Sequence, residues 1–189
     1  MPWPPALVHE FDLVDPGTPK ESDYYGPYNS LLHYLFPISQ DFLIFPQPKG
    51  PVFPDTAEDA TIFVVTAEQH PVFFLEVKPW RDINDLRARG VTDREMRERF
   101  QRLIGELRLP KLYGLSAMGP RYAVYEYTAA TSAIEPKAIP PHPRLVNDIA
   151  PVSRWDNDLL TDVGEIKIRS VVRTVKEMRQ EARQSKPII

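Results

Sequence analysis

The pattern of hydrophobic and polar positions is clearest over residues 59–79, DATIFVVTAEQHPVFFLEVKP. Two runs rich in β-branched and aromatic side chains, residues 61–66 and 71–77, flank the polar tetrad 67–70. Dense runs of this kind, separated by a short polar segment, are typical of two buried strands joined by a tight connection. The pattern therefore predicts a β-hairpin with a four-residue loop.

The predicted hairpin brings charged side chains together at one end. With a four-residue loop, Asp59 lies opposite Lys78, and Thr61 lies opposite Glu76. Alternate residues of a strand share a face, and so do directly opposed residues, so Asp59, Glu76 and Lys78 converge. Three interpretations are open at this point: a strand end that reaches the surface, a cross-strand ion pair, or a functional site.

Helical and strand-like periodicity continues on both sides of the hairpin. Amphipathic spacing predicts three helices, and a capping box of Thr92 and Glu95 marks the start of the second one. We expect helices over residues 24–36, 92–107 and about 165–184, and further strands over residues 41–47, 111–118 and 121–128.

This order of elements predicts an α/β or α+β fold, with a central mixed sheet of about five strands flanked by helices. The chain is expected to form one domain in three parts. These are an extended proline-rich arm over residues 1–22, a core over residues 23–128, and a proline-rich connection with a C-terminal helix that packs on the core over residues 129–189.

The composition allows a hydrophobic core and limits the chemistry. Of the 189 residues, 42% are apolar and none is cysteine. Disulfides and thiolate ligands are therefore excluded, so a metal ion would be held by oxygen or imidazole ligands. No segment reaches the roughly 20 apolar residues of a membrane span, and the N-terminus lacks the pattern of a secretory signal. We expect an intracellular protein, cytoplasmic or nuclear, that does not enter a membrane.

The net charge of −3 conceals an uneven distribution. Residues 1–60 hold nine acidic side chains and two lysines, whereas residues 165–186 hold seven basic and three acidic ones. Residues 81–108 hold eight arginines and six acidic side chains. Binding of nucleic acid needs only a local basic face, so the acidic total does not exclude it. Solvated helix faces with paired charges are the alternative explanation.

Two carboxylates beside a lysine form a known chemical arrangement. Carboxylate oxygens suit Mg²⁺ or Mn²⁺, which polarises a phosphoryl oxygen and acidifies a bound water. A lysine beside them can orient that water or stabilise the charge that develops on phosphate. We therefore expect an electrostatic role for Lys78 rather than the role of a general base.

At these residues the chain resembles the PD-(D/E)XK nuclease superfamily, whose restriction-endonuclease-like fold is a mixed sheet flanked by helices. The resemblance runs from about Tyr24 to Tyr127 and rests on the segments ED-ATIFVV and FFLEVKP. It implies Mg²⁺-dependent hydrolysis of phosphodiester bonds, with Asp59 and Glu76 as metal ligands and Lys78 as the third catalytic residue. The chain is also similar to uncharacterised fungal proteins with YGPYN-, PVFFLEVK-, LPKLYGLSAMG- and WDNDLL-like segments, which implies no function.

The first acidic position has a second candidate. The superfamily places a proline before that residue, and Pro54 precedes Asp55, whereas Glu58 precedes Asp59. Asp55 lies four residues further out, about 13 Å along an extended strand. We therefore prefer Asp59 and keep Asp55 as the alternative.

Several other side chains are candidates for supporting roles. Glu21 is either an additional acidic ligand or an exposed residue of the arm, and Gln47 either reaches the metal site or merely ends its strand. Arg97 and Gln101 could line the cleft from the helix that follows the motif, or belong to its solvated face. Candidates for phosphate binding are Arg81 and Arg94.

Three functions compete. The first is a nuclease that depends on Mg²⁺ or Mn²⁺ and acts on nucleic acid, with DNA expected over RNA from the habit of the superfamily. The second is a catalytically inactive module of the same fold that binds nucleic acid or a protein. The third is an assembly protein that forms a homodimer through its C-terminal helix. A fold of this kind can host all three.

Overall fold

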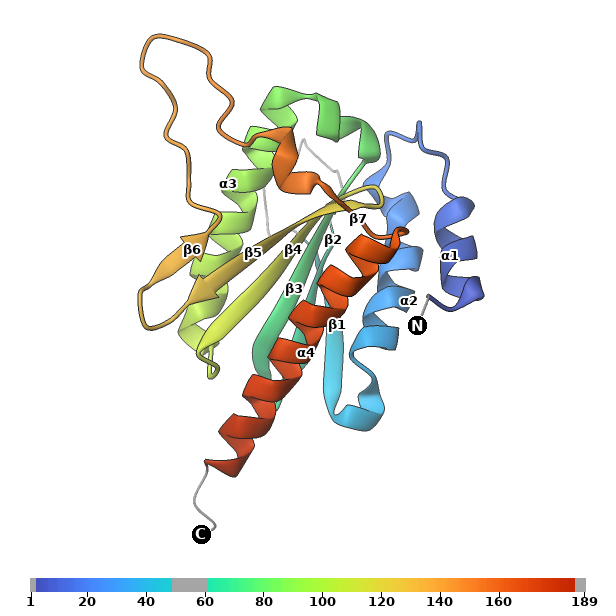
Figure 1. The fold of residues 1–189 in the computed structure, drawn as a ribbon, viewed down its shortest axis with the longest axis vertical. Coiled ribbons are helices and arrows are strands. Elements are labelled where there is room, and N and C mark those ends of the chain that lie inside the picture. Colours follow the sequence, from blue (N-terminus) through green and yellow to red (C-terminus); the bar gives the residue numbers. More distant parts are fainter. Residues whose placement is uncertain (1–2, 49–60, 186–189) are drawn as a thin grey trace.

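A seven-stranded mixed sheet forms the centre of the molecule (Figure 1), whose computed structural model describes residues 3–48 and 61–185. The strand order is β1-β2-β3-β4-β5-β6, and β7 pairs with β5. All neighbouring strands are antiparallel except β3 and β4, which are parallel. The strands are β1 (Phe42–Pro48), β2 (Thr61–Ala67), β3 (His70–Lys78), β4 (Lys111–Met118), β5 (Arg121–Thr128), β6 (Ala133–Glu135) and β7 (Asn157–Asp158).

Four α-helices flank the sheet within the described residues. They are α1 (Pro5–Asp12), α2 (Tyr25–Leu35), α3 (Leu86–Leu103) and α4 (Asp162–Gln184). Short 3-10 helices lie at Glu21–Tyr24, Ile38–Gln40, Trp80–Asn84, Ile104–Glu106 and Val152–Trp155. The predicted fold class, a mixed sheet flanked by helices with a helix at the C-terminal end, is confirmed. Among the helices described here, none is long and apolar enough to cross a membrane.

The helices divide between the two faces of the sheet. One hydrophobic cluster joins α1, α2 and α4 to Phe73, Leu75 and Val77 of β3, and the other joins α3 to Phe74. Figure 1 shows α4 crossing one face and α3 on the opposite face. Alternation along β3 therefore separates the two layers, because odd and even residues of the strand point to opposite sides.

The turn of the β2–β3 hairpin is shorter than predicted. Ala67 pairs with His70, so the turn consists of Glu68 and Gln69 alone. Both residues have positive φ angles, 52° and 67°. This backbone geometry matches the twist of the flanking strands and permits a two-residue connection, although Gly and Asn adopt it more readily than Glu and Gln.

A β-bulge then changes the register of the hairpin. The pairing shifts between Val65 and Thr66, and Ile62 lies opposite Glu76. The prediction that Thr61 lies opposite Glu76 is therefore wrong by one residue. A bulge inserts one extra residue into one strand, so every pair beyond it moves by one position.

Helix α3 begins earlier than predicted. Asp85 is its N-cap, and the Asp85 side chain accepts hydrogen bonds from the backbone amides of Arg87 and Ala88. Thr92, the predicted cap, lies inside the helix and is buried. The capping box of Thr92 and Glu95 does not form, because the chain is already helical before Thr92.

The N-terminal segment is not an extended arm. It contains α1, and Trp3, Leu7 and Phe11 are buried in the cluster that α1 shares with α2 and α4. The Trp3 indole donates a hydrogen bond of 2.7 Å to the carbonyl of Leu159, just before α4. The first residues of the described chain therefore belong to the core.

Helix α4 is confirmed as an amphipathic helix, capped by Thr161. Its apolar stripe is buried in the shared cluster and consists of Ile168, Val171, Val172, Val175 and Met178. This stripe packs on the chain's own sheet. A homodimer through α4 remains a prediction, and it would need other residues of the helix.

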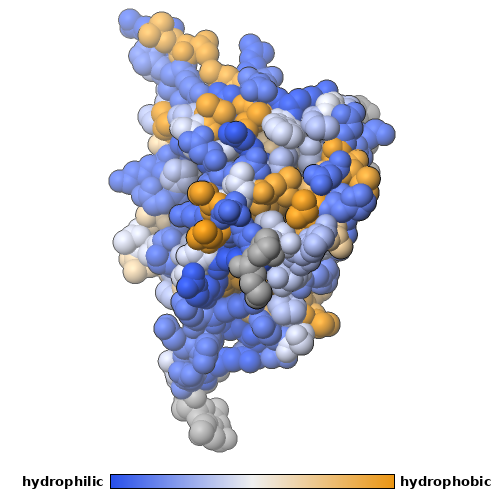
Figure 2. Space-filling model, turned by 45° about the vertical axis from the view of Figure 1, so that its right-hand side comes forward, coloured by the Kyte–Doolittle hydropathy of each residue, from blue (hydrophilic) through white to orange (hydrophobic). Residues whose placement is uncertain are grey.

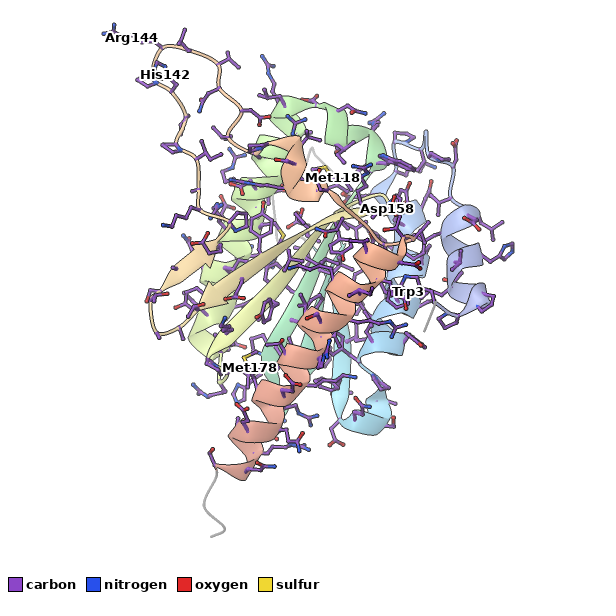
Figure 3. All side chains as sticks on the ribbon, viewed as in Figure 1. Trp3, Met118, His142, Arg144, Asp158 and Met178 are labelled. Carbon is purple, nitrogen blue, oxygen red and sulfur yellow. The ribbon has the colours of Figure 1, made fainter. Side chains whose placement is uncertain are left out.

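The connection between β6 and the 3-10 helix at Val152–Trp155 projects from the rest of the fold. His142 and Arg144 lie near its outer end (Figure 3). Leu145 and Val146 are 69% and 90% exposed. The inner ends of this connection are nevertheless fixed to α3 through arginine side chains.

Candidate functional site

The site begins with two charged residues at the end of β3. Glu76 and Lys78 lie on the face of this strand that α3 covers, and both pair with the parallel strand β4. Glu76 is opposite Ser116, and Lys78 is opposite Met118. Because α3 connects β3 to a parallel neighbour, the C-terminal ends of both strands meet at one edge of the fold.

Three carboxylates surround the Lys78 ammonium. Its Nζ lies 3.0 Å from Glu95 Oε2, 3.6 Å from Glu76 Oε1 and 3.8 Å from Glu21 Oε2. Glu21 comes from the 3-10 helix before α2, and Glu95 comes from α3. We call these four residues the Lys78 cluster. The cluster joins the end of the predicted N-terminal arm to two elements of the predicted core, β3 and α3, around one cation.

The cluster is largely shielded from solvent. The side chain of Glu76 is 1% exposed, those of Lys78 and Glu21 are 12% and 13% exposed, and that of Glu95 is 27% exposed. Charges interact more strongly in such surroundings than in water. The outer side of Glu95 is thus the part of the cluster most accessible to a solute.

A second cation lies within electrostatic range of the cluster. Burial lowers the pKa of the Arg99 guanidinium, while the carboxylates of Glu76 and Glu95 oppose that change. Arg99 follows Glu95 by one turn of α3. The cluster with Arg99 therefore contains three acidic and two basic side chains, and it retains negative character that favours another cation.

Glu21 lies beside Lys78, and its role as an additional metal ligand stays a prediction. It is not an exposed residue of an arm, since its side chain lies beside Lys78 and accepts a hydrogen bond of 3.1 Å from the Tyr25 hydroxyl. The 3-10 helix that carries it packs against the end of β3. Glu21 is therefore not exposed, for the same reason that the predicted N-terminal arm is not extended: the N-terminal segment folds onto the core.

Both candidates for the first acidic position, Asp59 and Asp55, lie outside the described residues. Gln47 lies in β1, where its backbone pairs with Ile62, the residue opposite Glu76. Gln47 and Glu76 thus occupy the same row of the sheet, two strands apart. The observed register applies only to Thr61 and later residues, so the role of Asp59 stays a prediction.

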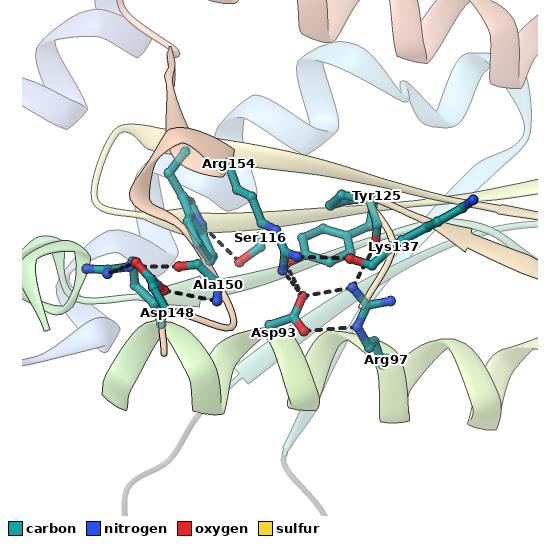
Figure 4. Close-up of polar contacts among 11 residues, drawn as sticks. Asp93, Arg97, Ser116, Tyr125, Lys137, Asp148, Ala150 and Arg154 are labelled. Atoms are coloured by element: carbon teal, nitrogen blue, oxygen red, sulfur yellow. Dashed lines mark hydrogen bonds and ion pairs between the residues drawn. The ribbon is translucent and has the colours of Figure 1, made fainter. Parts of the chain in front are cut away.

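Arg97 belongs to a different network (Figure 4). Its guanidinium donates hydrogen bonds of 2.9 and 3.1 Å to Asp93 and of 2.7 Å to the carbonyl of Pro136. Asp93 also accepts from the Tyr125 hydroxyl and from Arg154. Burial raises the pKa of Tyr125, and Asp93 adds to that effect.

This network has a structural consequence. Arg154 donates to the carbonyl of Lys137, and Arg89 donates to the carbonyls of Ala150 and Ile83. Arginines thereby fix both ends of the projecting connection to α3. Arg97 was expected to line the cleft beside the metal site. Its hydrogen bonds to Asp93 and Pro136 give it a structural role in this network instead.

The remaining supporting candidates lie on the surface. Gln101 is exposed on α3. The side chains of Arg81 and Arg94 are 61% and 67% exposed, and their nearest acidic neighbours are Asp82 and Glu98 at 3.8 and 3.9 Å. Exposed guanidinium groups with such long ion pairs can turn toward a phosphate, so the phosphate-binding role of Arg81 and Arg94 stays a prediction.

Glu95 and Arg99 are members of the site that the sequence pattern did not indicate. The pattern predicted a role in helix capping for Glu95 and no particular role for Arg99. The signal was present in Asp85, because a helix capped there continues past Thr92 and presents residues 95 and 99, one turn apart, on the same side.

The carboxylates of the Lys78 cluster are suitable ligands for a hard cation, but they are arranged around the Lys78 ammonium. Carboxylate oxygens are the ligands that Mg²⁺ and Mn²⁺ prefer. Within residues 3–48 and 61–185, however, no three acidic or histidine side chains are placed to share one metal ion. The predicted ligand Asp59 lies outside these ranges, so the metal site at Glu76 stays a prediction.

Comparisons of the chain with family models, with curated proteins and with solved structures give no match. The function is therefore inferred from the residues and their geometry.

Proposed function

We propose that this chain is a divalent-metal-dependent nuclease that hydrolyses phosphodiester bonds, with DNA as the expected substrate over RNA. The observation that carries the proposal is the Lys78 cluster. Glu76 and Lys78 stand two residues apart at the end of a central strand, and Glu21 and Glu95 converge on them. The resemblance of this strand to the Glu-x-Lys strand of the PD-(D/E)XK superfamily supports the same function.

The arrangement of elements also supports the proposal. The chain runs α2, β1, β2, β3, α3, β4, with β3 and β4 parallel and α3 between them. This is the order of elements on which the resemblance rests. A crossover through a helix places the C-terminal ends of β3 and β4 side by side, where substrate-binding residues commonly gather in open α/β sheets.

Each residue has a defined task in this proposal. Glu76 would supply a buried carboxylate oxygen as a ligand for the metal ion. Lys78 places a positive charge beside the scissile phosphate. Arg81 and Arg94 bind flanking phosphates from the surface. A bound Mg²⁺ or Mn²⁺ would supply polarisation of the phosphoryl oxygen and a more acidic water. Substrate phosphate would compete with Glu95 for the ammonium of Lys78, since both are anions.

The direct test is cleavage of single-stranded and plasmid DNA with Mg²⁺ or Mn²⁺. Wild type should cleave, and EDTA should abolish cleavage. Lys78→Ala should reduce the rate by about 100-fold or more, because it removes a charge that stabilises the transition state. DNA binding by this variant, measured separately, should remain within about threefold of wild type.

Lys111→Ala is the matched control. Lys111 is also a strand lysine paired with a carboxylate, Glu126 at 2.6 Å, but it lies at the opposite end of β4. It should cleave at the wild-type rate. Absence of cleavage by wild type on all substrates, together with no rise in melting temperature on addition of Mg²⁺ or Mn²⁺, would overturn the enzymatic proposal.

The first acidic position can be assigned in the same assay. Asp59→Asn should abolish cleavage and Asp55→Asn should leave it unchanged if Asp59 binds the metal. The reverse result would assign that role to Asp55. Cleavage at the wild-type rate by both variants would show that neither residue is required.

A second candidate function is an inactive module of the same fold that binds nucleic acid or a protein. The Glu95 contact favours it, because Lys78 is held at 3.0 Å by a carboxylate from α3 and the whole cluster forms a buried ion network. In that case wild type binds DNA without cleavage, and Glu76→Gln leaves the affinity unchanged. An intracellular location, cytoplasmic or nuclear, belongs to either proposal.

A further inference from the structure

A groove runs along α4 on the face of the sheet opposite to the Lys78 cluster. Two adjoining hollows of about 460 and 370 Å³ form it, and both are lined by Lys176 and Gln180. The first extends toward Tyr34 of α2, and the second extends toward Asp41 in the connection to β1. Lys176 and Gln180 line both hollows, which therefore adjoin along α4, and we call the two hollows together the α4 groove.

Positive charge dominates the α4 groove. Among the described residues that line it, five are cationic and two are carboxylates, Asp41 and Glu177. The cations are Arg169, Arg173, Lys176, Arg179 and Arg183. They follow one another along α4 at intervals of three or four residues, so they share one side of the helix. At about 1.5 Å per residue, the row extends for about 20 Å.

Some of these cations already have partners in the chain. Arg169 donates to Glu165, and Arg183 donates to Glu68 and Asp41. Arg179 donates to the carbonyl of Gln40 and to Asp41. These contacts hold the two ends of the row in place.

The middle of the row is different. Within the described residues, no carboxylate lies at ion-pair distance from Arg173 or Lys176. Arg173 is exposed, and Lys176 is half-buried with its Nζ 5.9 Å from the centre of the Phe42 ring. Burial lowers the pKa of Lys176, and no acidic neighbour offsets this effect. An anion bound here would be attracted by both cations, without competition from a carboxylate at ion-pair distance among the described residues.

A partly exposed aromatic ring lines the groove. Tyr34 lies at one end, is 42% exposed and is contacted by the Arg169 guanidinium at 5.3 Å from its ring centre. The Phe42 ring is buried beneath Lys176 and Arg179, so it supports these cations and is not open to a ligand. Figure 2 shows a largely hydrophilic surface toward the C-terminal end of α4. Cations in a row, with an exposed ring at one end, are the features with which proteins bind the backbone of single-stranded nucleic acid.

We propose that the α4 groove binds single-stranded nucleic acid through its phosphate backbone. The partner is a flexible strand because the row is narrow and follows the helix, whereas a duplex is a wide and stiff rod. An acidic protein segment would satisfy the charges but not the exposed Tyr34 ring to the same degree. This site is separate from the Lys78 cluster, and binding there needs neither a metal ion nor cleavage.

The test is fluorescence anisotropy with a fluorescein-labelled oligothymidylate in EDTA at low salt. The double variant Arg173→Glu/Lys176→Glu should bind at least about tenfold more weakly, because it reverses two charges beside the bound phosphates. The milder Arg173→Ala should also weaken binding, and it should lower the salt dependence of log K by about 0.7 for each phosphate that the variant no longer neutralises. Melting temperatures of both variants report on folding.

Lys167→Glu is the control on the same helix. Lys167 is exposed on α4 but does not line the groove. Lys167→Glu makes the same change of net charge per residue as the groove substitutions but lies outside the groove, so this variant should bind oligothymidylate within about twofold of wild type. Equal decreases of affinity in Lys167→Glu and in the groove variants would show a general charge effect and overturn the proposal.

Two other outcomes would also overturn it. One is oligothymidylate binding that is unchanged in Arg173→Glu/Lys176→Glu. The other is a labelled polyglutamate that binds as tightly as oligothymidylate and competes with it, which would assign the groove to an acidic protein. Oligothymidylate binding that the groove variants weaken, by a wild-type protein that cleaves no substrate, would support the α4 groove and reject the nuclease, so the two proposals fail independently.

Discussion

At the scale of single residues, Lys78 is the charge on which its cluster depends. It is the cation at 3.0–3.8 Å from all three carboxylates, and one of them, Glu76, is 1% exposed. A buried carboxylate that loses its cation retains the cost of desolvation without the compensating attraction. The stability of the fold and the chemistry of the site are therefore linked at this residue.

Lys78→Met should lower the free energy of unfolding by about 3 kcal/mol at neutral pH, because the variant leaves buried negative charges without their nearest ammonium. Urea unfolding monitored by tryptophan fluorescence would measure this change. Lys111→Met is the comparison, since its pair with Glu126 is about one-third exposed. Such pairs contribute at most about 1 kcal/mol. Equal effects in the two variants would contradict a special role for Lys78.

The residues of the site were predictable to different degrees. Glu76 and Lys78 stand out because charged residues two apart end an otherwise apolar strand, and alternation places them on one face. Glu95 and Arg99 were not found, since their approach to β3 depends on where α3 starts and how it packs. Glu21 depends on the fold of the N-terminal segment, which no local pattern specifies.

At the scale of elements, the N-cap of α3 places Glu95 and Arg99. Asp85 accepts hydrogen bonds from two amides at the helix start, and those bonds, led by the one from Ala88, lower its pKa from an ordinary value of 3.8. A carboxyl whose pKa is lowered by folding stabilises the folded state above its unfolded pKa. That contribution disappears as the pH falls through the lower folded pKa.

Asp85→Ala should therefore lower the melting temperature at neutral pH, and the difference from wild type should narrow as the pH falls from about 4 to 2. Circular dichroism melts across this range would measure it. Asp85→Asn keeps a hydrogen-bond acceptor but loses the charge. Its melting temperature at neutral pH should therefore lie between those of wild type and Asp85→Ala. A difference that stays constant with pH would show that the charge of Asp85 does not contribute.

The strands show what local pattern can and cannot specify. Strands β4 and β5 match their predicted ranges, residues 111–118 and 121–128, because Pro110 precedes β4 and Gly119-Pro120 separate the two runs. The β2–β3 hairpin was predicted, but its register was not. Its turn uses Glu and Gln at positive φ, and its bulge at Val65/Thr66 leaves no mark in the hydrophobic pattern.

At the scale of the whole molecule, the N-terminal segment connects parts of the chain that are far apart in sequence. Trp3 is 6% exposed, donates to the Leu159 carbonyl and lies 4.3 Å beneath the Arg169 guanidinium. Through these contacts Trp3, just before α1, stabilises the position of the start of α4, the helix that carries the α4 groove. The binding surface proposed there thus depends on residues from both ends of the chain.

Trp3→Ala should lower the free energy of unfolding by about 3–4 kcal/mol, because it removes a large buried ring and one hydrogen-bond donor. Urea unfolding followed by far-UV circular dichroism would measure the change. Leu13→Ala is the comparison: Leu13 is 71% exposed just after α1 and should change stability by less than about 0.5 kcal/mol. A small effect of Trp3→Ala would indicate that the segment is dispensable for folding.

The sequence by itself determined the secondary structure that rests on local periodicity: β1 to β5 of the seven-stranded sheet, the amphipathic α4, and a Glu76–Lys78 pair at the end of a buried strand. It did so because alternation and helical spacing record which side of each element is buried. The short strands β6 and β7 were not predicted, because each is too brief to show alternation. Tertiary structure alone decided the register of the hairpin, the start of α3, and the convergence of Glu21 and Glu95 on Lys78. Those features depend on contacts between residues distant in the chain, whose energies no local pattern contains.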